Sequence, residues 1–226
     1  MDNFNISIPK LEFDFQIGES PLRMDNRYCK PRQLKNLKPR QLKFSNARDL
    51  AKQTVIGNSE KINVLVSGNF VFGDFIEAYF REHNIQTDRM VLTTLSMNKY
   101  NVDSLKSLMV GKYVKNLDVI VSSFFAHEKD NLIKYIYETL DFDDRFQLAV
   151  VRSHTKTVLF KTLGGKYIVI NGSANLRSSN NIETFTIEEC KETYDFHLEY
   201  SERILDKYKT INRTLGAKAL WETITE

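Results

Sequence analysis

The chain has 226 residues, of which 42% are hydrophobic and 27% charged, values that exclude a wholly disordered chain and suit a globular protein. No apolar run approaches the roughly 18 residues that a membrane span needs, and no secretory leader follows Met1. Two cysteines are too few for a disulfide framework or a cysteine-based metal site. We therefore expect a cytoplasmic protein that does not contact a membrane.

Positive charge is concentrated near the N-terminus, where residues 23–52 hold ten basic and two acidic side chains. Within this stretch Lys-Pro-Arg-Gln-Leu-Lys occurs twice, at 30–35 and 38–43. Clustered lysine and arginine bind phosphates with release of counterions, so the stretch indicates a polyanionic partner, with a merely solvated arm as the alternative. We expect an extended basic N-terminal arm at residues 1–44. Its candidates for binding nucleic acid are Arg32, Lys35, Arg40 and Lys43.

Residues 45–226 are expected to form a single α/β domain, in which short apolar runs predict buried strands and apolar residues three or four apart predict helices. The expected elements are a helix from Asn46, its N-cap, to 53, strand 62–66, helix 74–83, strand 90–95, helix 103–113, strand 117–125, helix 132–140 and strand 146–151. This alternation favours βαβ units, and hence a mostly parallel sheet with helices on both faces.

The alternation of strands and helices stops after residue 152. Two β-prone runs at 157–162 and 166–170 flank Leu163-Gly164-Gly165 and predict a hairpin. Residues 185–212 then predict a charged amphipathic helix, whose inward residues are Phe196, Tyr200, Ile204 and Leu205.

Polar residues suited to phosphate chemistry flank the predicted hairpin. His154 and Lys156 precede it, and alternate residues of an extended segment project from one face, so their side chains should point together. Ser173 and Asn175, at the other end, could do the same. An imidazole can attack phosphorus, while an ammonium and an amide can hold the oxygens on which negative charge develops. The alternatives are a hydrogen-bonded strand histidine and, for the serine and asparagine, a helix N-cap.

His154-x-Lys156 and Gly172-Ser173-x-Asn175 resemble the signature of the phospholipase D superfamily, and most closely that of its small single-motif, nuclease-like members common in phages and prophages. The resemblance implies a phospholipase D-like αβα sandwich and a two-step mechanism without metal or cofactor, in which His154 forms a phosphohistidine. It also implies that Glu183 holds the nucleophilic histidine. Arg177, just after the motif, is a further candidate for a phosphate contact.

Two features qualify this resemblance. The family's Asp would stand five residues after the motif lysine, and Lys161 occupies that position. The family mechanism also needs a second histidine, and one complete motif supplies only one, so the second is expected from His154 of another subunit in a homodimer. His127-Glu128-Lys129, the other His-x-Lys pair, has no Gly-Ser-x-Asn after it.

The sequence therefore predicts a metal-independent phosphodiesterase, with nucleic acid, and DNA in particular, as the expected substrate and partner. The catalytic candidates are His154, Lys156, Ser173, Asn175 and Glu183. The alternative is a catalytically degenerate relative that binds nucleic acid or acts in phage assembly. A true phospholipase is a weaker third interpretation, since such enzymes usually carry two motifs in each chain.

Overall fold

In the computed structural model, residues 38–43, 47–67, 70–123, 132–177 and 181–209 are described, the first of these ranges by its backbone alone. The strands are β1 (Lys38–Lys43), β2 (Glu60–Val66), β3 (Thr87–Thr94), β4 (Val114–Ser122), β5 (Phe146–Val151), β6 (Thr157–Thr162), β7 (Tyr167–Gly172) and β8 (Glu183–Glu189). The helices are α1 (Ala47–Gln53), α2 (Phe72–Glu82), α3 (Lys99–Val110), α4 (Leu132–Leu140) and α5 (Lys191–Tyr208).

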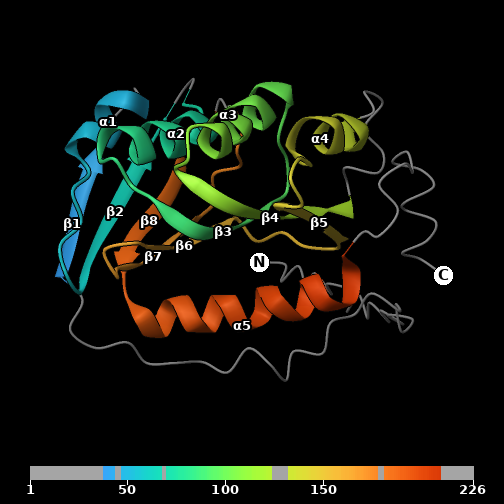
Figure 1. Cartoon of the computed structure of the whole chain (residues 1–226). Coiled ribbons are helices and arrows are strands. Elements are labelled where there is room, and N and C mark those ends of the chain that lie inside the picture. The colour runs from blue at the N-terminus through green and yellow to red at the C-terminus, as the bar shows by residue number, and fades with distance from the viewer. Residues whose placement is uncertain (1–37, 44–46, 68–69, 124–131, 178–180, 210–226) are drawn as a thin grey trace, which may run out of the picture.

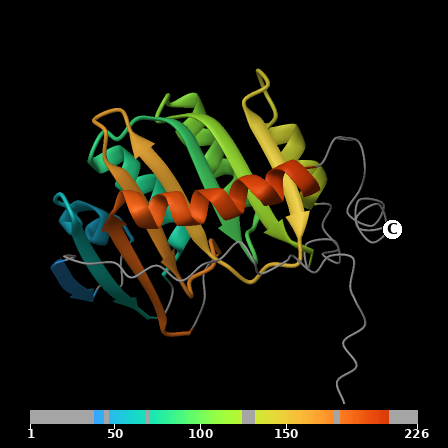
Figure 2. The same ribbon diagram turned by 90° about the horizontal axis from the view of Figure 1, so that it is seen from below.

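The described strands form one eight-stranded sheet between two helical layers, in the order β1-β2-β8-β7-β6-β3-β4-β5. Helices α1 to α4 lie on one face and α5 on the other (Figure 1). From below, α5 lies across the central strands, with β1 and β2 to one side (Figure 2). The expected three-layer α/β/α arrangement is therefore confirmed for the described residues.

Each helical layer buries its own hydrophobic core against the sheet. On the side of α1 to α4, the core includes Phe75 and Phe80 of α2 with Phe185 of β8, all of them fully or almost fully buried. On the other side, Ile204 and Leu205 of α5 pack against Leu159 of β6 and its neighbours in the sheet. Burial of apolar surface on both faces of the sheet is what the near-continuous apolar runs of the central strands predict.

The expectation of a mostly parallel sheet needs correction. Four of the seven strand pairings are antiparallel, and only β1–β2, β3–β4 and β4–β5 are parallel. The pairings show that β6 and β8 run opposite to the other six strands. The predicted hairpin accounts for β6, because a short turn forces its two strands to run antiparallel. The sheet is thus mixed. Of the two edges formed by strand ends, one holds the ends of six strands and the beginnings of β6 and β8.

Two predicted helix starts differ from the observed ones by four residues or more. Residues 183–189 form strand β8, and the helix expected from 185 begins only at Lys191. Helix α3 begins at Lys99 rather than at 103, because the Asn98 side chain accepts a hydrogen bond from the N–H of Asn101 while the Asn101 side chain accepts from the N–H of Asn98. This reciprocal capping box fixes the start of α3 four residues early.

The strand β1 lies within the segment expected to be an extended arm. It pairs in parallel with β2 at the edge of the sheet, and Pro39 is tolerated there because an edge strand has one side without ladder bonds. Residues 1–37 and the expected cap Asn46 lie outside the described residues. The boundary at residue 44 between arm and domain stays a prediction.

Candidate active site

Three adjacent strands bring the motif residues to one edge of the sheet. Strand β7 ends at this edge, while β6 and β8 begin there, and β7 lies between them. His154 and Lys156 come just before β6, Ser173 just after β7, and Glu183 is the first residue of β8. The edge is also the carboxyl edge of the parallel strands, where ligands of open α/β sheets commonly bind.

Lys156 is the buried member of the group, with only 7% of the residue exposed, while His154 is exposed. The Lys156 Nζ donates to the carbonyl oxygen of His154 at 2.7 Å and lies 3.1 Å from its Nδ1. A charged lysine can only donate, so Nδ1 accepts and the single proton of a neutral His154 ring is on Nε2. Burial lowers the pKa of Lys156, and the negative charge of Glu183 opposes this shift.

Ser173 is held by β8 through backbone and side chain together. Its N–H donates to the carbonyl of Thr184 at 2.8 Å, and its Oγ accepts the N–H of Thr184 at 3.0 Å. The hydroxyl donates to the Glu183 carboxylate. Glu183, expected to hold the histidine, is therefore hydrogen-bonded to Ser173, and it acts on Lys156 through its charge.

Gly172 explains why the motif requires a glycine before the serine. A Cβ at this position would lie 2.2 Å from the carbonyl oxygen of Thr184 and 2.5 Å from the Cα of Phe185. Real Cβ contacts are not that short, so β7 and β8 approach each other here only because residue 172 has no side chain. That approach lets the backbone of Ser173 reach Thr184.

The loop after Ser173 is anchored on the helical layer. Ala174 and Leu176 are buried in the core, and the Leu176 carbonyl accepts from the N–H of Gly73 at 2.9 Å and from Asn101 Nδ2 at 3.1 Å. Gly73 and Asn101 lie in the first turns of α2 and α3 and are positioning residues that sequence reasoning missed. The only signal for them was the Asn-x-x-Asn spacing of the α3 cap.

Asn175 is not brought into hydrogen-bond contact with the other candidates. Its Oδ1 is buried and has no hydrogen-bond partner in the described part of the chain. A buried, unsatisfied amide oxygen costs about 1–3 kcal/mol. The structure therefore pairs His154 with Lys156 and Ser173 with Glu183, couples the two pairs through the charge of Glu183 on Lys156, and leaves Asn175 two residues along the loop.

Lys161, where the resemblance would place an Asp, lies far from these two pairs. It pairs with Tyr167 at the turn end of the hairpin, and its Nζ sits 4.9 Å from the centre of the Tyr167 ring. Five residues of extended chain span about 16 Å, so the position-161 side chain is at the opposite edge from Lys156. The side chain of residue 161 is thus not part of the candidate site.

The remaining candidates lie at the surface or outside the described residues. Arg177 is exposed. Arg40 and Lys43 belong to β1, of which only the backbone is described, whereas Arg32 and Lys35 lie outside the described residues. Neither other described histidine belongs to the site: His83 Nε2 is 2.7 Å from the carbonyl oxygen of Ala51, and His197 lies on α5.

No protein-family model and no curated protein matches the sequence. Solved structures similar to this chain include Nuc from Salmonella typhimurium, a phospholipase D family member, with 12% identity and a TM-score of 0.48 over 66% of this chain and 97% of that one. A phosphatidylserine synthase from Haemophilus influenzae has 11% identity and a TM-score of 0.47 over 73% of this chain. A polyphosphate kinase from Porphyromonas gingivalis has 14% identity and a TM-score of 0.47 over 66% of this chain. The matched regions span 44% of the synthase and 26% of the kinase.

Two further features of the described residues concern metal binding and membranes. Within these residues, no three His, Cys, Asp or Glu side chains are grouped so that they could hold a metal ion. Over the same ranges, no helix has the length and apolar character needed to cross a membrane.

Proposed function

We propose that the protein is a metal-independent phosphodiesterase that cleaves nucleic acid, with His154 as the nucleophile. The observation that carries the proposal is the contact between the buried Lys156 ammonium and the exposed His154 ring at the edge where Ser173 and Glu183 also meet. A buried cation beside an exposed imidazole suits an anionic substrate that approaches from solvent, because the substrate's oxygens can replace the weak Lys156–Nδ1 contact.

Substrate binding would also prepare the nucleophile. While Lys156 donates to Nδ1, the ring proton occupies Nε2, and Nε2 has no free lone pair. When a phosphate oxygen accepts from Lys156, Nδ1 is free to carry the ring proton, and the lone pair moves to Nε2. Nε2 then forms a bond to phosphorus as the bond from phosphorus to the leaving oxygen breaks, and Lys156 stabilises the negative charge on the non-bridging oxygens.

The leaving oxygen needs a proton, which a second imidazolium supplies. In the second step that imidazole takes a proton from water, the water oxygen attacks phosphorus, and the bond between phosphorus and His154 breaks. Neither other described histidine contacts His154: His83 Nε2 meets the Ala51 carbonyl, and His197 Nε2 lies 3.5 Å from Nδ2 of Asn171. We therefore assign the second imidazole to His154 of another copy of the chain in a two-fold dimer.

Exposed apolar side chains support a protein contact beside the site. Tyr100, in the first turn of α3, is 80% exposed, and Ile182, next to Glu183, is 70% exposed. They are two of five large hydrophobic residues that are exposed in the described part of the chain. Light scattering should give the mass of two chains for the wild type, and the Ile182→Asp variant should shift towards one.

The place of β1 supports nucleic acid as the substrate. Lys43 pairs with Leu65, and Leu65 pairs with Thr184, so the end of β1 lies two strand spacings, about 10 Å, from the beginning of β8. Strand β1, which is part of the basic stretch, therefore ends close to the candidate site. A phosphate backbone held by this stretch could continue to Lys156.

The test is turnover of bis(p-nitrophenyl) phosphate and of a labelled oligonucleotide. His154→Ala should abolish both activities, whereas the matched variant His127→Ala should keep them, and excess EDTA should not inhibit the wild type. Loss of activity with EDTA and its recovery with magnesium would contradict the mechanism, and equal loss in both histidine variants would contradict the shared site.

One observation favours the alternative of a degenerate nucleic-acid-binding or phage assembly protein. Nδ1 of His154 has an ammonium at hydrogen-bond distance, and no carboxylate oxygen of a described residue takes that place. A wild-type protein that binds the oligonucleotide tightly but turns over neither substrate would establish this alternative.

A further inference from the structure

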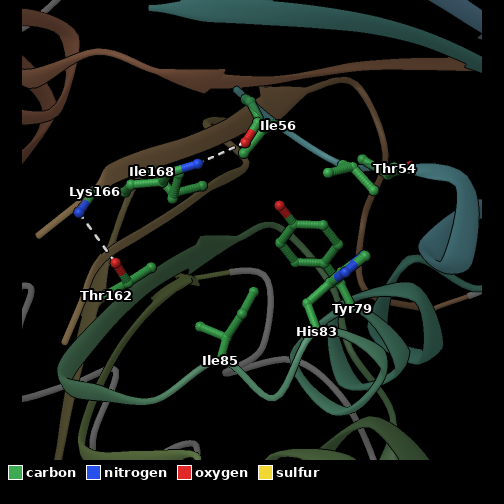
Figure 3. A pocket seen from close by; sticks show the side chains of 9 residues that line it. Thr54, Ile56, Tyr79, His83, Ile85, Thr162, Lys166 and Ile168 are labelled. Atoms are coloured by element: carbon green, nitrogen blue, oxygen red, sulfur yellow. Dashed lines mark hydrogen bonds between the residues drawn. The ribbon is translucent and has the colours of Figure 1, made fainter. Parts of the chain in front are cut away.

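A cavity lies at the edge of the sheet opposite the candidate active site. It encloses about 180 Å³ between the segment that follows α1, the end of α2 and the β6–β7 hairpin (Figure 3). Ile56, Ile85 and Ile168 supply its apolar wall. No acidic side chain lines it.

The hydroxyl of Tyr79 is one of the polar groups that face this cavity. Tyr79 is 2% exposed, and its ring points from α2 into the cavity (Figure 3). No described residue forms a hydrogen bond with this hydroxyl, and its oxygen is not sealed from solvent, so it opens onto the cavity. Burial raises the pKa of Tyr79 far above its ordinary value, so the hydroxyl stays protonated and is available as a donor.

Lys166 supplies a positive charge to the same cavity. Its half-buried ammonium donates one hydrogen bond, to the carbonyl of Ile56 at 2.8 Å, and forms no ion pair with a described carboxylate. An ammonium has three N–H donors, so two remain. The other polar side chains that line the cavity have partners of their own: Thr54 Oγ1 donates to the Leu50 carbonyl, His83 Nε2 meets the Ala51 carbonyl, and Thr162 Oγ1 accepts the N–H of Lys166.

Two donors, one of them charged, therefore face an otherwise apolar space. We propose that this cavity is a binding site for a small monocarboxylate with an aromatic or branched apolar body, whose carboxylate accepts from Lys166 Nζ and Tyr79 Oη. A cavity of about 150 Å³ with apolar walls holds benzene, so this one has room for a body of that size. The exposed side chains of Val55 and Leu163, on either side, extend the apolar surface at its rim.

The site is independent of the proposed catalysis. Strands β6 and β7 run from this cavity to the edge that carries Lys156 and Ser173, so the two sites lie at opposite ends of the hairpin. A carboxylate bound here should not compete with a phosphodiester, and loss of either site would leave the other to be tested separately.

Benzoate is the probe for the first experiment, followed by NMR of the ¹⁵N-labelled protein. Benzoate should shift the amide resonances of Ile56, Ile85 and Lys166, whereas benzyl alcohol, which has no charge, should bind at least about tenfold more weakly, as expected when a charge-assisted hydrogen bond is lost. If the lining amides do not respond to millimolar benzoate, or if benzyl alcohol binds as tightly, the proposal is wrong.

Two substitutions test the donors separately. Lys166→Met should weaken benzoate binding at least about tenfold, and Tyr79→Phe, which keeps the ring and so should keep the fold, should weaken it several-fold. The matched control is Lys161→Met in the same hairpin, whose ammonium lies over Tyr167 and does not line the cavity. Unchanged affinity in both Lys166→Met and Tyr79→Phe would overturn the assignment.

Discussion

Substitution of Gly172 by alanine tests whether close approach of β7 and β8 builds the candidate site. The added Cβ would lie 2.2 Å from the Thr184 carbonyl oxygen and 2.5 Å from the Cα of Phe185. Both are backbone atoms of β8, so no side chain can rotate away to make room. The two strands must separate, and the hydrogen bond from the Ser173 N–H to Thr184 is then weakened or lost.

The magnitude follows from these two effects. Overpacking costs about 1–3 kcal/mol, and a lost backbone hydrogen bond adds about 0.5–1.5 kcal/mol. We expect Gly172→Ala to lower the free energy of unfolding by about 2–4 kcal/mol, which most domains of this size survive. Equilibrium unfolding in urea measures the change. In the folded variant, NMR shifts of Ser173 and Glu183 should report the separation.

Two glycines of the hairpin turn provide controls. A Cβ at Gly164 would meet only Thr162 Oγ1, at 3.7 Å, so Gly164→Ala should change stability by no more than about 0.5 kcal/mol. Gly165 has open space around it but a φ of +90°, so Gly165→Ala isolates backbone strain, at about 1–2 kcal/mol. If Gly172→Ala unfolds at the same urea concentration as Gly164→Ala, the close approach of β7 and β8 does not require a glycine at position 172.

Three further outcomes follow. Burial lowers the pKa of His197, so the unfolded chain binds its proton first and stability should fall as the pH drops below 6.5; thermal unfolding of His197→Gln should show a smaller fall between pH 7 and pH 5. Burial likewise lowers the pKa of Lys156, because the charged form is destabilised away from water. Lys156→Met should therefore abolish turnover at pH 7 without lowering the urea concentration at the midpoint of unfolding. A clear loss of stability would contradict this reasoning. Removal of residues 1–37, which leaves β1 in place, should weaken oligonucleotide binding. The slope of log K against log salt concentration should become shallower by about 0.9 for each lost phosphate contact with duplex DNA. An unchanged slope in a salt titration would assign the segment another role.

Elements with strong local patterns were predicted well. Helix α4 and strand β5 begin and end at the predicted residues, because each carries a dense apolar pattern and is followed or preceded by polar turn residues. The order of strands could not be read in the same way. Strand β8 lies between β2 and β7, and its pairing with β2 joins residues more than a hundred positions apart, so no local pattern encodes it.

The segment that forms β8 also misled the helix prediction. Phe185 and Ile187 face one core, and Thr184 and Thr186 alternate with them, which is the period of a strand. Glu188 and Glu189, followed by the charged start of α5, made the segment look continuous with the helix. Only the tertiary pairing with β2 and β7 decides between the two interpretations.

The expected meeting of His154 and Lys156 is observed, but it does not arise from the alternation of side chains along a strand. His154 and Lys156 do meet, but they lie before β6, and the contact arises because the buried Lys156 side chain turns back to Nδ1 and to the carbonyl of His154. The alternation rule fails for Ser173 and Asn175, since the chain leaves the strand at Gly172. Ser173 stays at the edge with Glu183, while the Asn175 oxygen is buried.

The candidate site depends on the mixed direction of the strands, which the sequence did not predict. In a wholly parallel sheet, the residues before β6 would lie at the opposite edge from the residues after β7, and Lys156 and Ser173 would be a strand length apart. Because β6 and β8 run opposite to β7, the beginnings of β6 and β8 meet the end of β7. The hydrogen bond from the Gly172 N–H to the Lys156 carbonyl joins the end of β7 directly to the segment before β6. The same reversal carries residue 161 to the other edge, so this position, although only five residues from Lys156, is remote from the candidate site. Substitution of that position should therefore affect the hairpin and leave the candidate catalytic groups where they are.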